Sequence, residues 1–197
     1  MLLVLEEYFK EYPVKKKIVE TLYNNGVSIK NGKFFLNDIE ISLSSIAESI
    51  KVNRRTVYET IKFVNKNEVI KKIMENVFSQ TDTSRVSLLM GSQIVTIYIN
   101  KGSFARVYWE VMSLTKKYTP YIKEMYCKNS DQEETFIKMI FYNEIDSNIY
   151  RDMDGIAGIK HIVINSPVKI NVICNKCEIK ICPHKISSEI NKAEMYP

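Results

Sequence analysis

The feature that most constrains the fold is a pair of short amphipathic segments separated by a tight break at Lys51-Val52. The first segment, 42–50, can be capped by Ser42 or Ser44, and the second begins at Asn53, a residue type that favours helix N-caps. Apolar residues recur in the second segment with the spacing of one helical face: they are Val57, Ile61 and Val64. Two short helices joined by a turn of three or four residues follow the helix-turn-helix plan.

Residues 46–70 are similar to the helix-turn-helix of winged-helix and related bacterial and archaeal regulators. Small Ala47 lies where the two helices cross, and Val52 fills the gap between them. The resemblance implies that the outer side of the second helix binds double-stranded DNA, because cations neutralise phosphates or pair with guanine edges. The candidate contacts are Arg54, Arg55, Thr56, Tyr58, Glu59 and Lys62. The alternative is a helix-turn-helix used only for protein contacts or dimerisation.

Two positions depart from that family pattern. Lys51 stands where glycine is usual, so we expect either a slightly different turn or a left-handed backbone at some cost. Asn67-Glu68 replaces the Glu-Gly that commonly precedes a wing, so Glu68 to Val77 either continue as helix or begin a wing strand near Val69-Ile70. We therefore expect a helix-turn-helix domain, winged or not, over 1–80, with a hairpin at Asn31-Gly32.

The pattern changes after a polar stretch that we predict to be a linker, 81–92. Alternating and helical periodicities then follow in the order β-α-β-β-α-β, which is the split βαβ arrangement of the ferredoxin-like fold. The expected elements are strands 93–99, 121–127, 135–142 and 159–164 and helices 103–118 and 147–155. The fold class is thus α+β, with a second domain over 93–167 and a short tail over 168–197.

Residues 93–164 resemble the ACT domain, a module that senses small molecules and often binds amino acids. In that family a turn after the first strand leads into the helix, and Lys101 stands here where proline is common. Gly102 permits close backbone approach, and N–H groups at a helix start can hold a carboxylate. The candidate ligand-binding residues are Asn100, Lys101, Gly102, Ser103 and Phe104. A ligand-free ferredoxin-like dimerisation domain is the alternative.

Together the two halves resemble an archaeal family of predicted amino-acid-metabolism regulators, in which a helix-turn-helix precedes an ACT domain. The resemblance implies a homodimer that binds double-stranded DNA and whose DNA affinity responds to a small-molecule effector, an amino acid. Two other readings stay open: a regulator that senses metal or redox state through its tail, and an allosteric partner subunit of a biosynthetic enzyme that does not touch DNA.

The tail carries four residues with the chemistry of metal ligands: Cys174, Cys177, Cys182 and His184. A Cys-x2-Cys turn supplies two thiolates, and Cys-x-His supplies two more ligands, which together meet the tetrahedral preference of zinc. With all four positions filled, such a zinc would be structural rather than catalytic. An iron–sulfur cluster is the rival cofactor, ligands from two chains are a further possibility, and a reduced, metal-free tail is the remaining alternative.

Composition sets the outer limits on function. The chain has 197 residues, 45% of them hydrophobic, and a formal net charge of +5, which is compatible with nucleic-acid binding without requiring it. No apolar run is long enough to cross a membrane, and no leader-like segment begins the sequence, so we expect a cytoplasmic protein. No phosphate loop, nucleophile elbow or paired-carboxylate pattern occurs, so we do not expect an enzyme.

Overall fold

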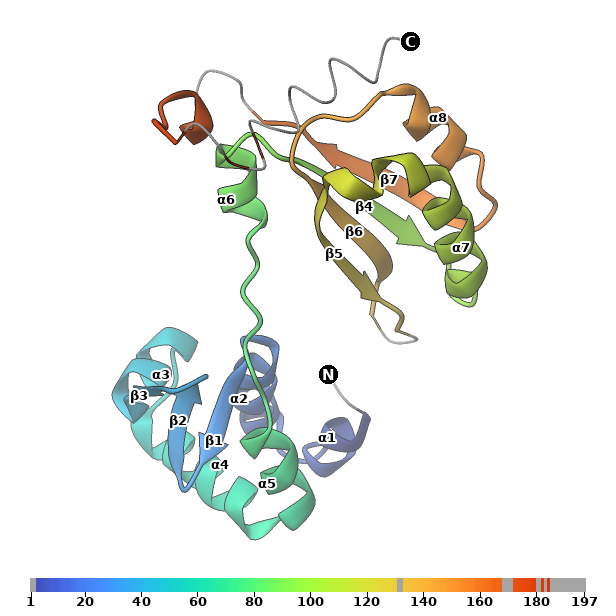
Figure 1. The fold of residues 1–197 in the computed structure, drawn as a ribbon. Helices are drawn as coiled ribbons and strands as arrows, with labels where there is room; N and C mark the ends of the chain where they lie inside the picture. Colours follow the sequence, from blue (N-terminus) through green and yellow to red (C-terminus); the bar gives the residue numbers. More distant parts are fainter. Residues whose placement is uncertain (1–2, 131–132, 168–171, 180–181, 183, 185–197) are drawn as a thin grey trace. The chain divides into compact units, whose positions relative to one another are not determined.

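The computed structural model describes residues 3–130, 133–167, 172–179, 182 and 184, which fall into two compact units (Figure 1). Unit 1 comprises Met1–Thr81 and unit 2 comprises Asp82–Pro197. Each unit has its own hydrophobic core, and each is therefore described by itself. Within the described residues no helix is both long and apolar enough to cross a membrane.

Unit 1 combines five helices with a small antiparallel sheet among its described residues (Figure 1). The sheet has the strand order β1-β2-β3, and the predicted hairpin at Asn31-Gly32 joins its first two strands. Both hairpin residues have positive φ, 52° and 77°, as a type I′ turn requires. The elements are α1 (Leu3–Tyr8), α2 (Pro13–Asn24), β1 (Val27–Lys30), β2 (Lys33–Leu36), β3 (Ile39–Ile41), α3 (Leu43–Ile50), α4 (Arg54–Lys66) and α5 (Glu68–Glu75).

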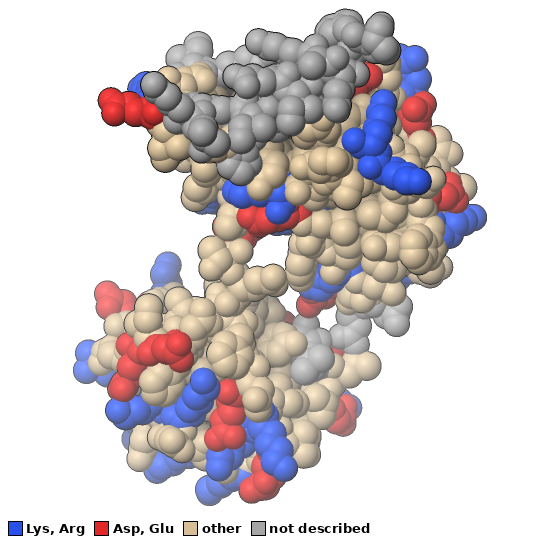
Figure 2. All heavy atoms as spheres, viewed as in Figure 1, with Lys and Arg blue, Asp and Glu red and all other residues tan. Residues whose placement is uncertain are grey.

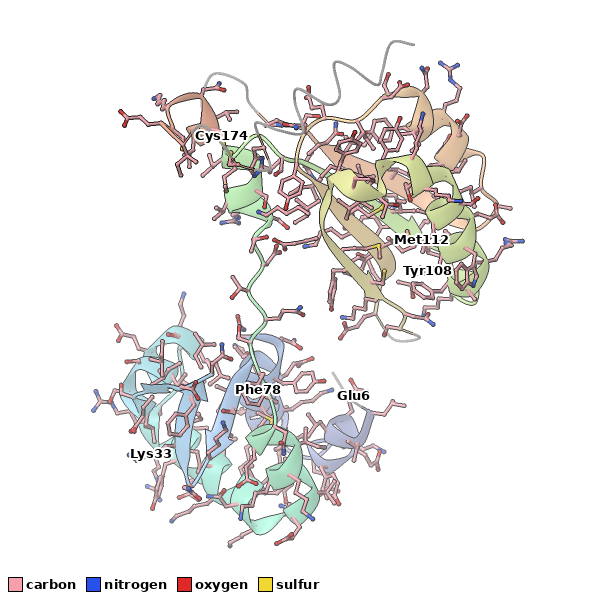
Figure 3. All side chains as sticks on the ribbon, in the orientation of Figure 1. Glu6, Lys33, Phe78, Tyr108, Met112 and Cys174 are labelled. Carbon is pink, nitrogen blue, oxygen red and sulfur yellow. The ribbon has the colours of Figure 1, made fainter. Side chains whose placement is uncertain are left out.

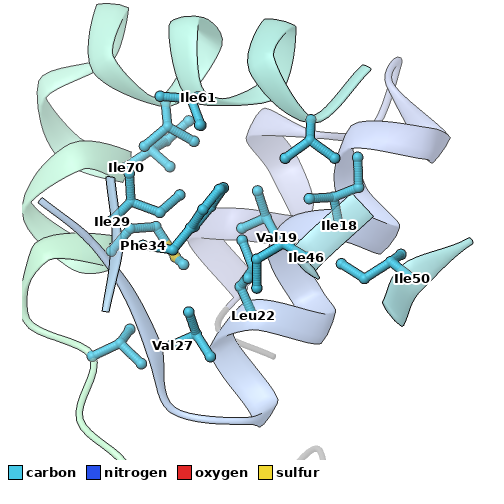
Figure 4. Close-up of a cluster of buried hydrophobic side chains, with 14 of the residues drawn as sticks. Ile18, Val19, Leu22, Val27, Ile29, Phe34, Ile46, Ile50, Ile61 and Ile70 are labelled. Atoms are coloured by element: carbon cyan, nitrogen blue, oxygen red, sulfur yellow. The ribbon is translucent and has the colours of Figure 1, made fainter. Parts of the chain in front are cut away.

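A single apolar core holds the helices of unit 1 against the sheet (Figure 4). Phe34 of β2 is only 1% exposed and lies among aliphatic side chains of α2 and β1. From α4, Ile61 enters the same core, and Ile70 enters it from α5. The helix-turn-helix is therefore positioned by a sheet that precedes it in the chain.

Of the two alternatives for residues 68–77, the structure has the helix and not a wing strand beginning near Val69-Ile70. Residues 68–75 form α5, whose Ile70 and Met74 are completely buried in the core of unit 1. The reason is periodicity: Ile70, Ile73 and Met74 are spaced for one face of a helix, which outweighs the β propensity of the Val69-Ile70 pair. Unit 1 has its sheet before α3 and α4 instead.

Unit 2 has the predicted β-α-β-β-α-β order and a four-stranded antiparallel sheet in the order β5-β6-β4-β7. Helices α7 and α8 cover one face, where Val107 and Val111 of α7 are completely buried against strand residues such as Ile97. The elements are α6 (Ser84–Leu89), β4 (Gln93–Ile99), α7 (Phe104–Thr115), the 3-10 helix η1 (Lys116–Tyr121), β5 (Ile122–Lys128), β6 (Thr135–Phe141), α8 (Asn148–Asp154), β7 (Ile159–Asn165) and the 3-10 helix η3 (Ile173–Asn175).

The segment predicted to be a linker, 81–92, contains a helix that belongs to unit 2. Residues before and within α6 bond to the neighbouring strands β5 and β6: Thr83 donates to both carboxylate oxygens of Glu124 at 2.8 and 2.7 Å. Lys138 donates to Asp82 at 3.2 Å. Ser87 is completely buried, and its hydroxyl accepts a hydrogen bond from the Lys123 ammonium at 2.9 Å. The polar composition of 81–92 predicted a loop, because the residues that bind this segment to the sheet are distant in sequence.

The sheet face opposite α7 carries a row of aromatic rings, one from each strand, which we call the ring row: Tyr126, Phe136, Tyr98 and His161. Their neighbouring centroids are 5.6, 6.0 and 4.4 Å apart, and the last pair is stacked. Tyr126 is 42% exposed, and His161 is exposed as well. Among the described residues, no helix covers this apolar face at the ring row.

Candidate DNA-binding surface and ligand pocket

Two side-chain caps and one left-handed residue fix the geometry of the helix-turn-helix. Ser42 accepts from the backbone N–H of Ser45 at 3.0 Å, and Asn53 accepts from that of Arg55 at 2.8 Å. Between them, Lys51 has φ 58° and ψ 49°, so of the two alternatives for this residue the structure has the left-handed backbone. The N–H of Val52 then bonds to the carbonyl of Ala47 at 2.9 Å. These contacts satisfy backbone groups that the helix ends would otherwise leave unpaired.

One side of helix α4 is buried in the core of unit 1, and the other side is exposed. Its buried side consists of Val57, Thr60, Ile61 and Val64, none more than 4% exposed. The predicted contact residues lie on the remaining surface: Arg54, Arg55, Tyr58, Glu59 and Lys62 are exposed, and Thr56 is half-buried. The five exposed residues therefore lie on the side of α4 that faces away from the core, and Thr56 lies at the edge of that side.

Electrostatics on that side are mixed in sign. The Lys62 ammonium lies 4.5 Å from the centroid of the Tyr58 ring, a cation–π arrangement that keeps both side chains extended together along the helix. Lys and Arg side chains are spread over the visible face of unit 1 among Asp and Glu (Figure 2). The surface is thus locally basic at the start of α4 and is not a uniform basic patch.

The sequence did not reveal a hollow where α3 meets α4. Its volume is about 480 Å³, and it is lined by Ser44, Ala47, Glu48, Val52, Asn53 and Arg54. Glu48, in the last turn of α3, lines this hollow together with Arg54, the first residue of α4. A carboxylate there can accept from a base-edge amino group and disfavours a phosphate.

The sequence predicted the hairpin turn at Asn31-Gly32 but not its position beside α4. A Cβ added to Gly32 would lie 3.8 Å from Nδ2 of Asn65, so the turn packs next to the C-terminal half of that helix. The neighbouring Lys33 is exposed and pairs with Glu40 at 2.9 Å (Figure 3). Only the tertiary packing of the sheet on α4 brings this turn to the helix.

In unit 2 the predicted ligand-binding turn is hydrogen-bonded to the segment that precedes β7. The Asn100 N–H donates to the carbonyl of Gly158 at 2.9 Å, and the Ser103 N–H donates to that of Asn100 at 3.1 Å. Gly102 has φ 78° and open space around its Cβ position. The turn is therefore braced against the segment before β7, and its glycine is required by backbone conformation rather than by a close neighbour.

Part of that turn lines an open hollow of about 380 Å³ at the end of the sheet, and we call it the end pocket. Of the predicted ligand residues, Asn100 and Lys101 line it, whereas Phe104 packs on the core and Ser103 packs against Gly158. The complete lining is Tyr98, Ile99, Asn100, Lys101, Glu133, Glu134, Thr135 and Lys160.

The end pocket brings together charges of both signs that the sequence keeps apart. Lys101 and Lys160 supply ammonium groups, and Glu133 and Glu134 supply carboxylates from the turn between β5 and β6. A hydrogen bond from Lys128 holds the pKa of Glu133 below its usual value, so this carboxylate stays ionised. A pocket with this lining is suited to a small zwitterion. Only the ladder pairing of β4 with β6 and β7 brings Glu133, Glu134 and Lys160 to Asn100.

The tail residues predicted to bind metal do not form a cluster in this structure. Cys174, Cys177 and Cys182 are of intermediate exposure, and His184 is 7% exposed. Within the described part of the chain, no three His, Cys, Asp or Glu side chains converge as a metal site would require. Burial lowers the pKa of His184, which favours its neutral ring. The metal site stays a prediction.

Comparisons with known proteins assign no family to this chain. No protein-family model matches the sequence, and no curated protein matches it. Among solved structures, an AsnC-family transcriptional regulator from Agrobacterium tumefaciens aligns at 12% identity and TM-score 0.26, covering 78% of this chain and 88% of its own.

Two further solved structures align over similar lengths. AsnC of Escherichia coli shows 15% identity and TM-score 0.27 over 79% of this chain and 91% of its own. A transcriptional regulator from Neisseria meningitidis in complex with L-Met shows 13% identity and TM-score 0.25 over 84% of this chain and 89% of its own. Because these TM-scores lie well below 0.5, no conclusion about this chain rests on them.

Proposed function

We propose that this protein is a transcriptional regulator that binds double-stranded DNA through α4 and whose DNA affinity responds to an amino acid. The observation that carries the DNA-binding part is α4 itself. The helix is capped at Asn53, fixed by a buried side, and presents a complete polar side beginning with Arg54 and Arg55. In the proposed complex this polar side lies in the major groove.

Replacing Arg54 and Arg55 together by alanine tests this part of the proposal. We expect weaker binding to duplex DNA and a smaller salt dependence, by about 1.8 in the slope of log K against log salt if both contact phosphates, since each contact contributes about 0.9. The matched control is Lys116→Ala with Lys117→Ala, which removes the same charge from exposed positions of unit 2. An equal loss in both double variants would show only a net-charge effect and would refute a specific role for α4.

The ligand-responsive part of the proposal is supported by the end pocket. A free α-amino acid carries a carboxylate for Lys101 and Lys160 and an ammonium for Glu133 and Glu134, and the volume of about 380 Å³ accommodates one. Effector binding changes DNA affinity only if the effector binds one conformation better than another. We therefore expect the pocket to be coupled to the arrangement of two DNA-binding units in a dimer.

Calorimetric titration with individual amino acids tests the pocket. One amino acid should bind the native chain, and Lys160→Ala and Glu134→Gln should each weaken that binding at least tenfold. Glu144→Gln removes the same type of charge from an exposed residue outside the pocket lining and should bind as the native chain does. Unchanged binding in the two pocket variants would place the effector elsewhere.

We also propose that two copies associate through the ring row of unit 2. Helix-turn-helix regulators that read two half-sites are symmetric dimers, and a two-fold axis lets one apolar face cover its own copy. Tyr126→Arg should then give a monomer in sedimentation, whereas Trp109→Arg should leave the dimer intact. Trp109 is 71% exposed but lies on α7, which covers the other sheet face. A dimer in both variants would exclude the ring row as the interface.

A further inference from the structure

The cysteine-rich tail contains a turn that places two thiols close together in sequence and structure. Helix η3 is followed by hydrogen bonds from the Lys176 N–H to the carbonyl of Ile173 at 3.0 Å and from the Cys177 N–H to that of Cys174 at 3.4 Å. Cys174 and Cys177 thus flank one tight turn, with Cys174 on η3 (Figure 3). This is the local geometry by which a Cys-x2-Cys unit supplies two thiolates to one metal ion.

The turn is attached to unit 2 just before its first cysteine. Val172 is 8% exposed and contacts Gly91, where an added Cβ would lie 3.1 Å from Cγ1 of Val172. Gly91 has φ 95°, a conformation that side-chain-bearing residues rarely adopt. The close packing at Gly91 therefore fixes where the cysteine turn begins relative to the sheet of unit 2.

A second attachment point holds the histidine of the same cluster. His184 is 7% exposed, its Nδ1 lies 3.0 Å from the carbonyl oxygen of Tyr142, and its ring meets that of Tyr142 edge-on at 5.1 Å. Asn143 donates to the carbonyl of His184 at 3.4 Å. When Nδ1–H donates to a backbone carbonyl, Nε2 carries the lone pair, and this arrangement is typical of metal-ligating histidines.

We infer that Cys174, Cys177, Cys182 and His184 of one chain bind a single Zn²⁺ ion. The donor set is three thiolates and one imidazole Nε2, which is a common structural zinc site. Binding displaces three thiol protons and leaves the complex with one negative charge. Because no three of these side chains converge within the described residues, zinc would bring the cysteine turn and Cys182 to the anchored His184.

This zinc site would have a structural consequence for unit 2. Its two ends are already attached, at Gly91 through Val172 and at Tyr142 through His184, so the ion would close a cross-link between the start of β4 and the end of β6. All four coordination positions are taken by the protein, which leaves none for a reacting water. The inference does not depend on DNA binding or on the end pocket.

Cobalt and zinc titrations of the reduced, metal-stripped full chain test the inference. We expect one Co²⁺ per chain with the visible absorption of a tetrahedral thiolate site, its displacement by one Zn²⁺, and a zinc-dependent rise in the melting temperature of unit 2. Cys177→Ser and Cys182→Ser should each weaken zinc binding at least tenfold. Since His184 is buried, His184→Gln is judged by its circular dichroism before its metal affinity.

The matched control is Cys127→Ser, because Cys127 lies on β5 outside the tail and burial raises the pKa of its thiol. This variant should bind zinc as the native chain does. Any of three results would overturn the inference: no tetrahedral cobalt spectrum, one metal ion for every two chains, or a brown protein that contains iron and inorganic sulfide.

Discussion

Replacing Lys51 by glycine should stabilise unit 1, although it removes an entire side chain. Lys51 has φ 58° and ψ 49° at the end of α3, a left-handed conformation that costs an L-residue about 1–2 kcal/mol. Glycine adopts it freely but loses about 0.5–1 kcal/mol more conformational freedom on folding. The midpoints of these two ranges differ by a net gain of about 0.75 kcal/mol, equivalent to a few degrees in the melting temperature of a domain of this size.

The assay must report on unit 1 alone. The single tryptophan, Trp109, lies in unit 2, so its fluorescence follows the wrong unit. Native-state amide exchange of Val52 is suitable instead, because its N–H donates to Ala47 directly beside the substituted residue. Slower exchange in Lys51→Gly, with no change at core amides of unit 2, would agree with the calculation.

The control for this prediction is Lys51→Ala. Alanine removes the same charge and all methylene groups beyond Cβ but keeps the Cβ, so it should give no gain. If Lys51→Ala stabilises unit 1 as much as Lys51→Gly does, the effect comes from the side chain. If Lys51→Gly is no more stable than the native chain, the backbone of Lys51 is not strained and the reasoning is refuted.

Three further predictions concern packing and charge. Ile97→Ala in the core of unit 2 should cost about 2–5 kcal/mol and lower the transition followed by Trp109 fluorescence; an unchanged transition would contradict complete burial of Ile97. Asn53→Ala should destabilise unit 1 by about 1 kcal/mol through loss of the α4 cap, whereas Asn53→Asp should retain most of that stability in urea unfolding. The Asp82 pKa is lowered to about 2, first by its hydrogen bonds with Ser84 and then by Lys138. Since the folded pKa is below the unfolded one, its contribution is present above about pH 4 and is lost as the pH falls through 2; Asp82→Asn should flatten the acid dependence over that window, and an unchanged profile would rule out the contact.

Local sequence signals predicted the elements of both units where short-range chemistry decides them. Ser42 or Ser44 was expected to cap α3 and Asn53 to cap α4, and the structure has Ser42 and Asn53 in those places. The hairpin at Asn31-Gly32 was likewise predicted, and a left-handed Lys51 was one of two alternatives, because turn and cap preferences depend on a few neighbouring residues. The strand–helix order of unit 2 followed from periodicity alone.

Interactions between residues that are distant in sequence could not be predicted from local sequence signals. The segment that contains α6 was predicted to be a linker. The hydrogen-bond partners of Thr83 and Asp82 just before this helix, Glu124 and Lys138, lie far along the chain. Gln93 looked like an ordinary strand residue, yet its buried amide receives hydrogen bonds from the Ile145 N–H and from the hydroxyl of Tyr150 at 2.6 Å. Burial in that network raises the pKa of Tyr150, so its hydroxyl remains a donor.

The two candidate sites differ in the same way: one is formed by residues close in sequence, and the other by residues that are distant in sequence. The polar side of α4 is a single helix face and was predicted residue by residue. By contrast, the end pocket needs β4, β6 and β7 in register, so the sequence identified Asn100 and Lys101 but missed Glu133, Glu134 and Lys160. Charges that meet only through strand pairing leave no local pattern in the sequence.

The most direct test of the central claim is fluorescence anisotropy of the full chain on a duplex taken from upstream of its own gene. A scrambled duplex of the same composition is the control, and each amino acid is added in turn at several salt concentrations. The account predicts tighter binding to the upstream duplex, a steep loss with salt, and a shift in affinity with one amino acid. Equally weak binding to both duplexes, with and without every amino acid, would contradict it and favour a partner-subunit role away from DNA.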